Sequence, residues 1–99
     1  MSLFRRNSVS VQRARELVAE GWQLVDVRSA KEWKADHVTG AFHLPLDNLD
    51  RSLGRLNKSD SIVTICHSGV RSAMAARTLR QNGWTAVTVR GGMMAWRRK

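Results

Sequence analysis

Short apolar runs alternate along the chain with stretches of helical periodicity. The strongest run is residues 61–65, because β-branched side chains fill it and both of its faces are apolar enough for burial in a parallel sheet. Residues 23–27 and 85–89 form similar short runs. A brief alternating stretch lies at 8–11, and the run 41–45 predicts a short strand that its final proline ends, since proline donates no ladder hydrogen bond.

Helical patterns fill most of the intervals between these runs. Ser10 is a candidate N-cap for a helix that reaches Glu20 and is closed by Gly21. Its apolar positions recur at the spacing of one helix face: Ala14, Leu17 and Val18. The segment from Ser29 to Glu32 matches the capping-box pattern and predicts a second short helix.

The second half of the chain continues the same alternation. Asp47 is a candidate cap for a helical segment that contains three leucines, Leu49, Leu53 and Leu56. Residues 71–82 have a helical pattern that Gly83 ends, and a last short helix at 93–96 follows a pair of glycines. Alternating strands and helices joined by short loops imply right-handed βαβ units. We therefore predict an α/β fold with a parallel sheet and helices over both of its faces.

Length and composition limit the class of protein. The chain has 99 residues, of which 42% are hydrophobic, enough for one core, so we predict a single domain over residues 1–99. Residues 1–7 become basic and polar before any apolar run develops, which is unlike a signal peptide, and no window reaches the length of a membrane span. We expect a soluble, cytoplasmic protein without a membrane segment.

The chain is strongly basic, with a formal net charge of +9. The basic residues are spread along its whole length, acidic residues are interleaved with them in the first half, and no Lys/Arg run exceeds residues 97–99. This distribution favours a solvated basic surface over a nucleic-acid groove, so we expect no nucleic-acid partner. Such a surface would speed the approach of small anions.

Cys66 is the only cysteine, so no disulfide can form within the chain. One cysteine with three scattered histidines also does not match the spacing of a structural zinc site. A free cysteine is by default a buried, inert residue, but this one directly follows the strongest strand candidate. In open α/β sheets ligands bind at that end of the strands, which favours a functional role for Cys66.

The residues after Cys66 suit a stabilised thiolate. They lead into the predicted helix, whose first N–H groups have no partner within the helix and can hold an anion. Such a site can lower a cysteine pKa from about 8.5 into roughly the 3.5–7.5 range. Gly69 permits the backbone angles that turn the amides inward, and Arg71 can brace the loop or meet an anionic substrate. Ser68 and Ser72 supply hydroxyl donors, and Ser72 can also stabilise the start of the helix.

At this point the sequence resembles the rhodanese family, and the resemblance extends over residues 9–96. The residues that carry it occur in the family's order, namely Asp26-Val27-Arg28, Glu32-Trp33, His37-Val38-Thr39-Gly40-Ala41, Pro45, the loop from Cys66 to Ser72, Gly91-Gly92 and Trp96. The chain departs from the usual pattern at Asp36, where glycine is more common, and at Thr39, which replaces a frequent proline. Neither position belongs to the Cys66 loop.

The resemblance implies a five-stranded parallel sheet and a sulfurtransferase. Cys66 would take sulfane sulfur from an anionic donor such as thiosulfate as a persulfide and pass it to cyanide, a thiol or a protein. The family also implies that main-chain amides hold the persulfide, here within the cradle His67, Ser68, Gly69, Val70, Arg71 and Ser72. It implies no metal and no organic cofactor. Nothing in the sequence indicates an oligomeric state.

Other polar and aromatic residues of the pattern have structural interpretations. We expect Asp26 and Arg28 to form a structural ion pair or to brace a loop. His37 and His43 are expected to make local hydrogen bonds, and the side chain of His67 to point to solvent while its amide contributes. The four tryptophans lack the basic interleaving of a base-stacking surface and are expected to pack in or around the core.

Two other functions stay open from the sequence. Phosphatases related to this fold also use a Cys-to-Arg loop, but theirs is one residue longer than the His67-Ser68-Gly69-Val70 segment, which suits a larger phosphate. A sulfur-carrier or regulatory module acting with a partner protein is the second alternative. With no second cysteine in the chain, release of the sulfur requires an external acceptor in either sulfur-transfer hypothesis.

Overall fold

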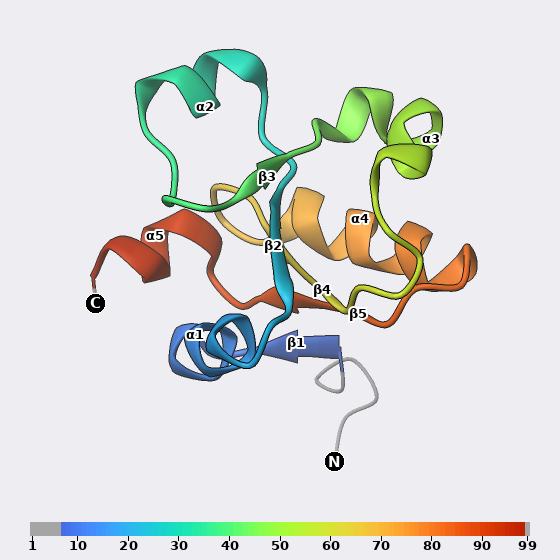
Figure 1. The fold of residues 1–99 in the computed structure, drawn as a ribbon. Coiled ribbons are helices and arrows are strands. Elements are labelled where there is room, and N and C mark those ends of the chain that lie inside the picture. The colour runs from blue at the N-terminus through green and yellow to red at the C-terminus, as the bar shows by residue number, and fades with distance from the viewer. Residues whose placement is uncertain (1–6, 99) are drawn as a thin grey trace.

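A parallel β-sheet of five strands runs through the middle of the molecule in the computed structural model, which describes residues 7–98 (Figure 1). The strands lie in the order β1-β5-β4-β2-β3, and every neighbouring pair is parallel. Their bounds are β1 (Ser8–Val9), β2 (Gln23–Asp26), β3 (Phe42–His43), β4 (Ile62–Ile65) and β5 (Ala86–Val89). The predicted α/β fold with a parallel sheet is confirmed, and its edge strands β1 and β3 are shorter than the patterns that indicated them.

Helices cover both faces of the sheet, as predicted. Their bounds are α1 (Val11–Ala19), α2 (Ala30–Ala35), η2 (Leu46–Asn48), α3 (Leu49–Ser52), η3 (Leu53–Arg55), α4 (Val70–Gln81) and α5 (Gly92–Arg97). Buried residues of α1 and α5 pack against one face, and those of α4 and α3 pack against the other. Within residues 7–98, none of these helices is both long and apolar enough to cross a membrane.

Strand β4 is the most buried element of the sheet. All four of its residues are buried, because β5 and β2 flank it and both of its faces are covered. Val63 and Ile65 face the cluster that α1 and α5 complete, whereas Ile62 faces the cluster of α4. The continuous apolar run in the sequence is thus the signature of a strand with no solvent-facing side.

Two predicted helix caps are present. The Ser10 hydroxyl accepts a hydrogen bond from the Arg13 N–H at 3.1 Å. Ser29 and Glu32 form the complete capping box, since the Glu32 N–H donates to the Ser29 hydroxyl at 3.2 Å and the Ser29 N–H donates to the Glu32 carboxylate at 3.0 Å. Both helices therefore begin where the sequence indicated.

The predicted cap at Asp47 is wrong. Asp47 lies inside the 3-10 turn η2, which begins after Pro45, and neither η2 nor α3 has a side-chain cap. Proline fixes its own backbone in an open conformation, here with φ −54° and ψ 138°, and its carbonyl accepts from the Asn48 N–H at 3.1 Å. The turn therefore starts at the proline, and the segment divides into η2, α3 and η3.

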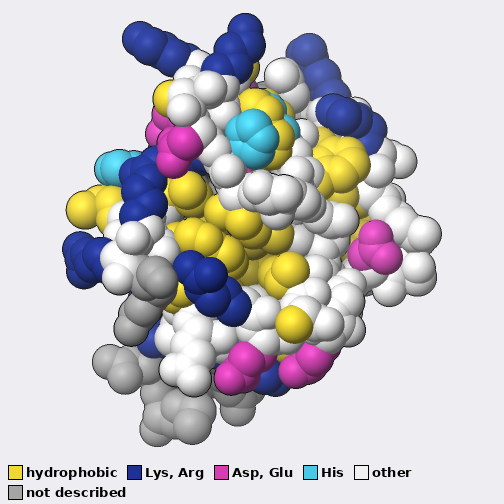
Figure 2. All heavy atoms as spheres, turned by 60° about the vertical axis from the view of Figure 1, so that its left-hand side comes forward, with side chains coloured by type: hydrophobic (Ala, Val, Ile, Leu, Met, Phe, Trp, Pro, Cys, Tyr) yellow, Lys and Arg dark blue, Asp and Glu magenta, His cyan; other side chains and the backbone are white. Residues whose placement is uncertain are grey.

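Charged side chains are dispersed over the face that carries α1, α2 and α5. Figure 2 views the molecule from this side and shows apolar side chains gathered in the middle, with Lys and Arg around them and acidic groups among them. Ion pairs link some of these charges, including Arg97 of α5 with Asp36 at 2.9 Å. No continuous basic track is visible on this face, in agreement with the dispersed charge of the sequence.

Asp26 and Arg28 form a buried ion pair, as expected from the sequence. Arg28 is 2% exposed and Asp26 is fully buried. The Arg28 Nη2 donates to the Asp26 carboxylate at 2.8 Å, Nε donates to it at 3.0 Å, and Nη2 also donates to the Asp36 carbonyl at 2.7 Å. One side chain thus joins the end of β2 to the segment after α2.

Replacing Asp26 with Ala should therefore destabilise the protein strongly. The substitution leaves the Arg28 guanidinium buried without its carboxylate, and breaking a buried pair in this way costs about 3 kcal/mol or more. Urea unfolding measures the loss. The matched control is Glu16→Ala, because its pair with Arg13 is half exposed on both sides and its loss should leave the midpoint nearly unchanged. Equal effects of the two substitutions would contradict this account.

Candidate active site

Cys66 lies at the carboxyl end of β4, where the chain leaves the sheet. Its side chain is 1% exposed, and only residues 67–69 separate it from α4. Asp26 ends the neighbouring strand β2 in register with Ile65, so the buried ion pair lies at the same edge of the sheet. The position predicted for the cysteine, between the most buried strand and a helix, is confirmed.

Hydrogen-bond donors surround the Cys66 sulfur. The Gly69 N–H donates to Sγ at 3.1 Å, and the N–H groups of Ser68 and Ser72 and the Ser72 hydroxyl act on the same atom. Burial by itself raises the pKa of the Cys66 thiol, but these hydrogen bonds outweigh it and bring the pKa below its ordinary value. The surroundings of Cys66 therefore favour the thiolate, which is the nucleophilic form.

Buried hydroxyl groups hold Ser72 behind the sulfur. Ser72 is fully buried, its hydroxyl lies 3.2 Å from the Gly69 carbonyl oxygen, and it accepts a hydrogen bond from the Thr88 hydroxyl at 2.7 Å. The Thr64 hydroxyl donates to the Ser72 carbonyl at 2.7 Å. Side chains of β4 and β5 thus anchor the first turn of α4, and the expected contribution of Ser72 to the start of this helix is confirmed.

The Arg71 side chain is held by α2. Its two terminal nitrogens donate to the two carboxylate oxygens of Glu32 at 2.7 and 2.9 Å. This hydrogen bonding lowers the pKa of Glu32 to about 2, so the carboxylate stays charged at all but strongly acidic pH. The sequence suggested that Arg71 braces the loop or meets an anionic substrate, and its hydrogen bonds to Glu32 correspond to the bracing role. The hydrogen bonds to Glu32 also raise the pKa of Arg71, and the negative charge of a Cys66 thiolate adds to this effect.

The remaining loop residues lie at the surface. His67, Ser68 and Val70 are exposed, and Val70 retains 70% of its accessible area. The exposure of His67 agrees with the expectation that its side chain points to solvent. Of the six predicted cradle residues, Gly69 donates to Sγ at 3.1 Å, and Ser72 and Ser68 also lower the pKa of Cys66.

The start of α5 supports the Cys66 loop from the other side. The Met93 N–H donates to the Cys66 carbonyl at 2.7 Å, and the Met94 N–H donates to the His67 carbonyl at 3.1 Å. Gly92 allows this approach: it has φ +55°, and a Cβ atom on it would lie 2.7 Å from the His67 carbonyl oxygen and closer still to that of Cys66. Only glycine fits between this helix and the loop.

The departure from the family pattern at Asp36 has a structural explanation. Asp36 has an extended backbone, with φ −169° and ψ 157°, which any residue adopts, so glycine is not required there. Its carboxylate accepts hydrogen bonds from Arg97 of α5 at 2.9 and 3.1 Å. A side chain at this position therefore adds a link between α2 and α5.

His37 and His43 make the local hydrogen bonds expected of them. A ring N–H of His37 donates to the Trp33 carbonyl and one of His43 donates to the Arg28 carbonyl, each at 2.8 Å. Both rings stack on Trp33, with centroid distances of 3.6 and 4.6 Å. Within residues 7–98, no group of three or more His, Cys, Asp or Glu side chains is placed to hold a metal ion.

Sequence reasoning missed three contributors to this site. Glu32 was assigned only a capping role, Gly92 only a turn, and Thr88 none. The pair of glycines before a short helix was a usable signal for Gly92, because two adjacent glycines exceed what a simple turn needs. A threonine in an apolar strand gives no such signal, since it matches ordinary strand composition.

Replacing Ser72 with Ala should raise the pKa of Cys66, because the substitution removes the hydroxyl donor to the thiolate while the amides remain. The pH dependence of alkylation by iodoacetamide, followed by mass, measures this change. At neutral pH we expect alkylation to slow by roughly tenfold, in line with about 1.5 kcal/mol for a hydrogen bond to a charged group.

Ser68→Ala is the matched control for this experiment. Ser68 acts on the sulfur through its backbone N–H, which alanine retains, and its side chain is exposed. The pH profile of this variant should match that of the unmodified protein. A Ser72→Ala profile that also matches it would show that the hydroxyl does not stabilise the thiolate.

Gly92→Ala should lower the free energy of unfolding by about 2–4 kcal/mol, because it combines a left-handed backbone with overlap against the loop carbonyls. Gly54→Ala is the control, since no heavy atom lies within 4 Å of a Cβ placed there, and its effect should stay within about 0.5 kcal/mol. Thermal and urea denaturation compare the two. Similar stabilities of the two variants would disprove the close packing of α5 on the loop.

Known proteins of similar sequence and structure identify the family of this chain. A family profile described as Rhodanese-like domain matches residues 10–99. The chain is 33% identical over 97 residues to the thiosulfate sulfurtransferase GlpE of Shewanella oneidensis, which covers 97% of this chain and 95% of GlpE. The human single-domain sulfurtransferase TSTD1 superposes with a TM-score of 0.85 at 28% identity, covering 94% of this chain and 96% of TSTD1.

A further relative is longer than this chain. The "Putative sulfur carrier protein YrkF" of Bacillus subtilis is 41% identical over 78 residues, which is 78% of this chain but 42% of YrkF. The chain likewise spans only 60% of the uncharacterized protein YqhL of the same organism. The match to the family profile and to GlpE over nearly the whole chain shows that this protein belongs to the rhodanese-like domain family.

Proposed function

We propose that this protein is a sulfurtransferase that moves sulfane sulfur through a persulfide on Cys66. The observation that carries the proposal is the environment of Cys66 at the end of β4. Its sulfur accepts a hydrogen bond from the Gly69 N–H, and donors of Ser72, Gly69 and Ser68 lower the pKa of its thiol. The thiolate is the form of cysteine that attacks a sulfur–sulfur bond. The relatives named as thiosulfate sulfurtransferases support the same activity.

The first half-reaction balances with thiosulfate as the donor. The Cys66 thiolate attacks the outer sulfur of thiosulfate, a new sulfur–sulfur bond forms, and the old one breaks with its electron pair leaving on sulfite. The terminal persulfide sulfur then carries the negative charge. The amides of Ser72, Gly69 and Ser68, which lower the pKa of the thiol, would stabilise this charge in the same way.

The second half-reaction returns Cys66 to its thiolate. An acceptor nucleophile attacks the terminal sulfur, and Cys66 leaves with the electron pair of the bond. Cyanide would yield thiocyanate, and a thiol would yield a new persulfide. Because the chain contains only one cysteine, the acceptor must come from outside it.

Arg71 has a supporting role in this scheme. Glu32 holds its guanidinium through two hydrogen bonds, so it positions the loop and contributes positive charge near Cys66. The overall excess of basic residues, with a formal net charge of +9, favours the approach of an anionic donor. The role of Arg71 is thus electrostatic and positional.

Exposed apolar side chains beside the loop favour a protein as the acceptor. Val70, Met74 and Met94 retain 70, 57 and 44% of their accessible areas. Val70 and Met74 lie one turn apart on α4, and Met94 is hydrogen-bonded to the loop backbone. Small donors and acceptors do not need such a surface, whereas a docking protein would cover it.

Intact-mass measurement tests both half-reactions. Treatment with thiosulfate should add the mass of one sulfur atom to the protein, and subsequent cyanide should remove it with release of thiocyanate. Cys66→Ser should abolish both the gain and the later loss of mass. The Ser68→Ala control should show both. Failure to form the adduct with thiosulfate and with other sulfane donors would disprove the proposal.

The same preparation separates the alternative functions. Rapid hydrolysis of an aryl phosphate that Cys66→Ser abolishes would identify a phosphatase instead. The four residues between Cys66 and Arg71 make that result unexpected, because they leave a smaller loop than phosphatases of this fold use. A persulfide that cyanide discharges but small thiols do not would favour a sulfur carrier that requires a partner protein.

A further inference from the structure

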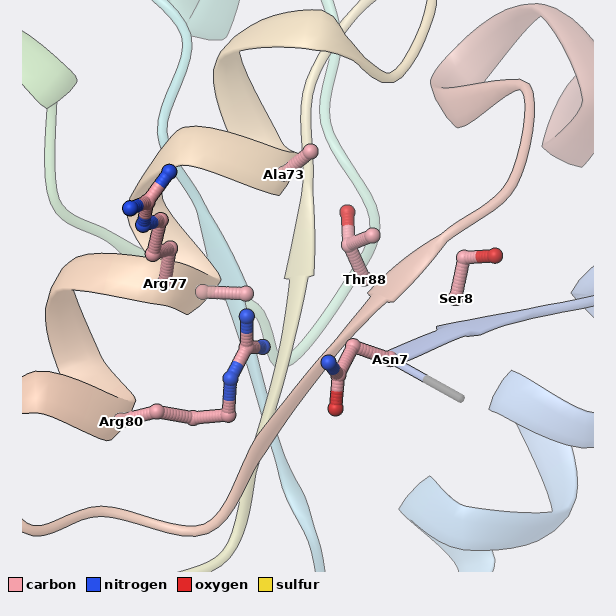
Figure 3. A pocket seen from close by; sticks show the side chains of 7 residues that line it. Asn7, Ser8, Ala73, Arg77, Arg80 and Thr88 are labelled. Carbon is pink, nitrogen blue, oxygen red and sulfur yellow. The ribbon is translucent and has the colours of Figure 1, made fainter. Parts of the chain in front are cut away.

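A second hollow lies on the α4 face of the sheet, beside the edge strand β1. Its volume is about 310 Å³, and it contains no residue of the Cys66 loop. Its walls come from the start of β1, from α4 and from β5, and are formed by Asn7, Ser8, Ala73, Ala76, Arg77, Arg80 and Thr88 (Figure 3). This space is large enough for a small hydrated ion.

Two arginines on α4 give this pocket its charge. Arg77 and Arg80 are three residues apart on the helix and therefore share a face. Burial lowers the pKa of Arg80, and the nearby positive charge of Arg77 lowers it further. Within residues 7–98 neither guanidinium forms an ion pair with a carboxylate, and no acidic residue lines the pocket.

The arginines that form ion pairs with carboxylates in the described residues lie outside this pocket. Arg13, Arg28, Arg71 and Arg97 each have a carboxylate oxygen at 3.0 Å or less, whereas the other arginines in residues 7–98 form no ion pair. Arg77 and Arg80 differ from the other unpaired arginines because both line one pocket, where an anion would relieve the repulsion between their charges. An unpaired pair of guanidinium groups at a pocket wall therefore points to a negatively charged ligand.

The hydrogen-bond donors at the pocket also suit an anion. Arg80 uses one nitrogen to donate to the Ala86 carbonyl at 3.1 Å, which anchors the guanidinium and leaves its other N–H groups available. Figure 3 shows the side chains of Asn7 and Arg80 pointing toward one another across the pocket. Planar guanidinium groups donate in a fork that matches the oxygens of phosphate and similar oxyanions.

We propose that the pocket between α4 and β1 is a binding site for a small tetrahedral oxyanion of the sulfate and phosphate class. Arg77 and Arg80 supply the charge and most of the donors, and the Asn7 amide completes the opposite wall. The site is separate from the Cys66 loop and independent of the sulfurtransferase proposal. An apolar ligand or a cation would leave the two guanidinium groups unpaired.

The pocket and the candidate active site are neighbours in spite of this separation. Thr88 lines the pocket, and its hydroxyl donates to the Ser72 hydroxyl at 2.7 Å on the side of Cys66. A binding experiment must therefore distinguish an anion in the pocket from an anion held by the loop amides. Residue-resolved NMR makes this distinction because the two sites have different backbone amides.

Titration of the uniformly ¹⁵N-labelled protein with inorganic sulfate, and separately with inorganic phosphate, at constant ionic strength tests the site. We expect saturable shifts of the amides of Asn7, Ser8, Arg77, Arg80 and Thr88. The double variant Arg77→Gln/Arg80→Gln should weaken this binding by at least about tenfold, since each charge-assisted hydrogen bond contributes substantially. Arg77→Gln alone, at an exposed position, provides a variant that should remain folded.

The matched control is Arg51→Gln/Arg55→Gln, which also removes two positive charges, one from α3 and one from η3. It should retain saturable binding at the pocket with little change in affinity. Shifts confined to the Cys66 loop, equal weakening in the two double variants, or a linear response without saturation would each overturn the proposal. Binding to the pocket in a protein that fails to form the Cys66 persulfide would still support it.

Discussion

The hydrogen bonds that converge on the Cys66 sulfur are the interaction on which the rest of the site depends. Burial at the end of β4 disfavours a charged sulfur, but the hydrogen-bond donors around it outweigh burial and lower the pKa of Cys66. The amides of Gly69 and Ser72 are available because the chain turns from a central strand directly into a helix, whose first N–H groups have no helical partner. The junction between β4 and α4 therefore provides the donors that favour the thiolate form of Cys66.

Several layers of the fold hold this junction in place. The Glu32 carboxylate links α2 to Arg71, and the first amides of α5 reach the loop carbonyls across Gly92. The buried Asp26 and Arg28 pair secures the same edge of the sheet. These contacts restrict the loop without touching the sulfur. Arg28 and Arg71 form ion pairs that brace the fold. The chain has more basic than acidic residues, and two of its other arginines, Arg77 and Arg80, line the second pocket.

Local patterns in the sequence predicted most of the elements correctly because their causes are local. A cap such as Ser10 bonds to an amide three residues away, and the run 61–65 owes its burial to its own composition. Asp47 was mispredicted for a related reason: it resembles a cap, but Pro45 begins the turn earlier through its fixed backbone angle. Two local signals competed, and the covalent constraint of proline prevailed.

The sequence by itself determined the α/β order, the strand-end position of Cys66 and the short spacing to the following arginine, since each depends on neighbours along the chain. Only the tertiary structure decided what that arginine contacts, because Glu32 lies 39 residues from Arg71. The same holds for Thr88, which lies 16 residues from the serine hydroxyl it supports, and for Gly92 beneath the loop. Contacts between distant residues arise from how the layers pack, and periodicity along one element carries no information about them.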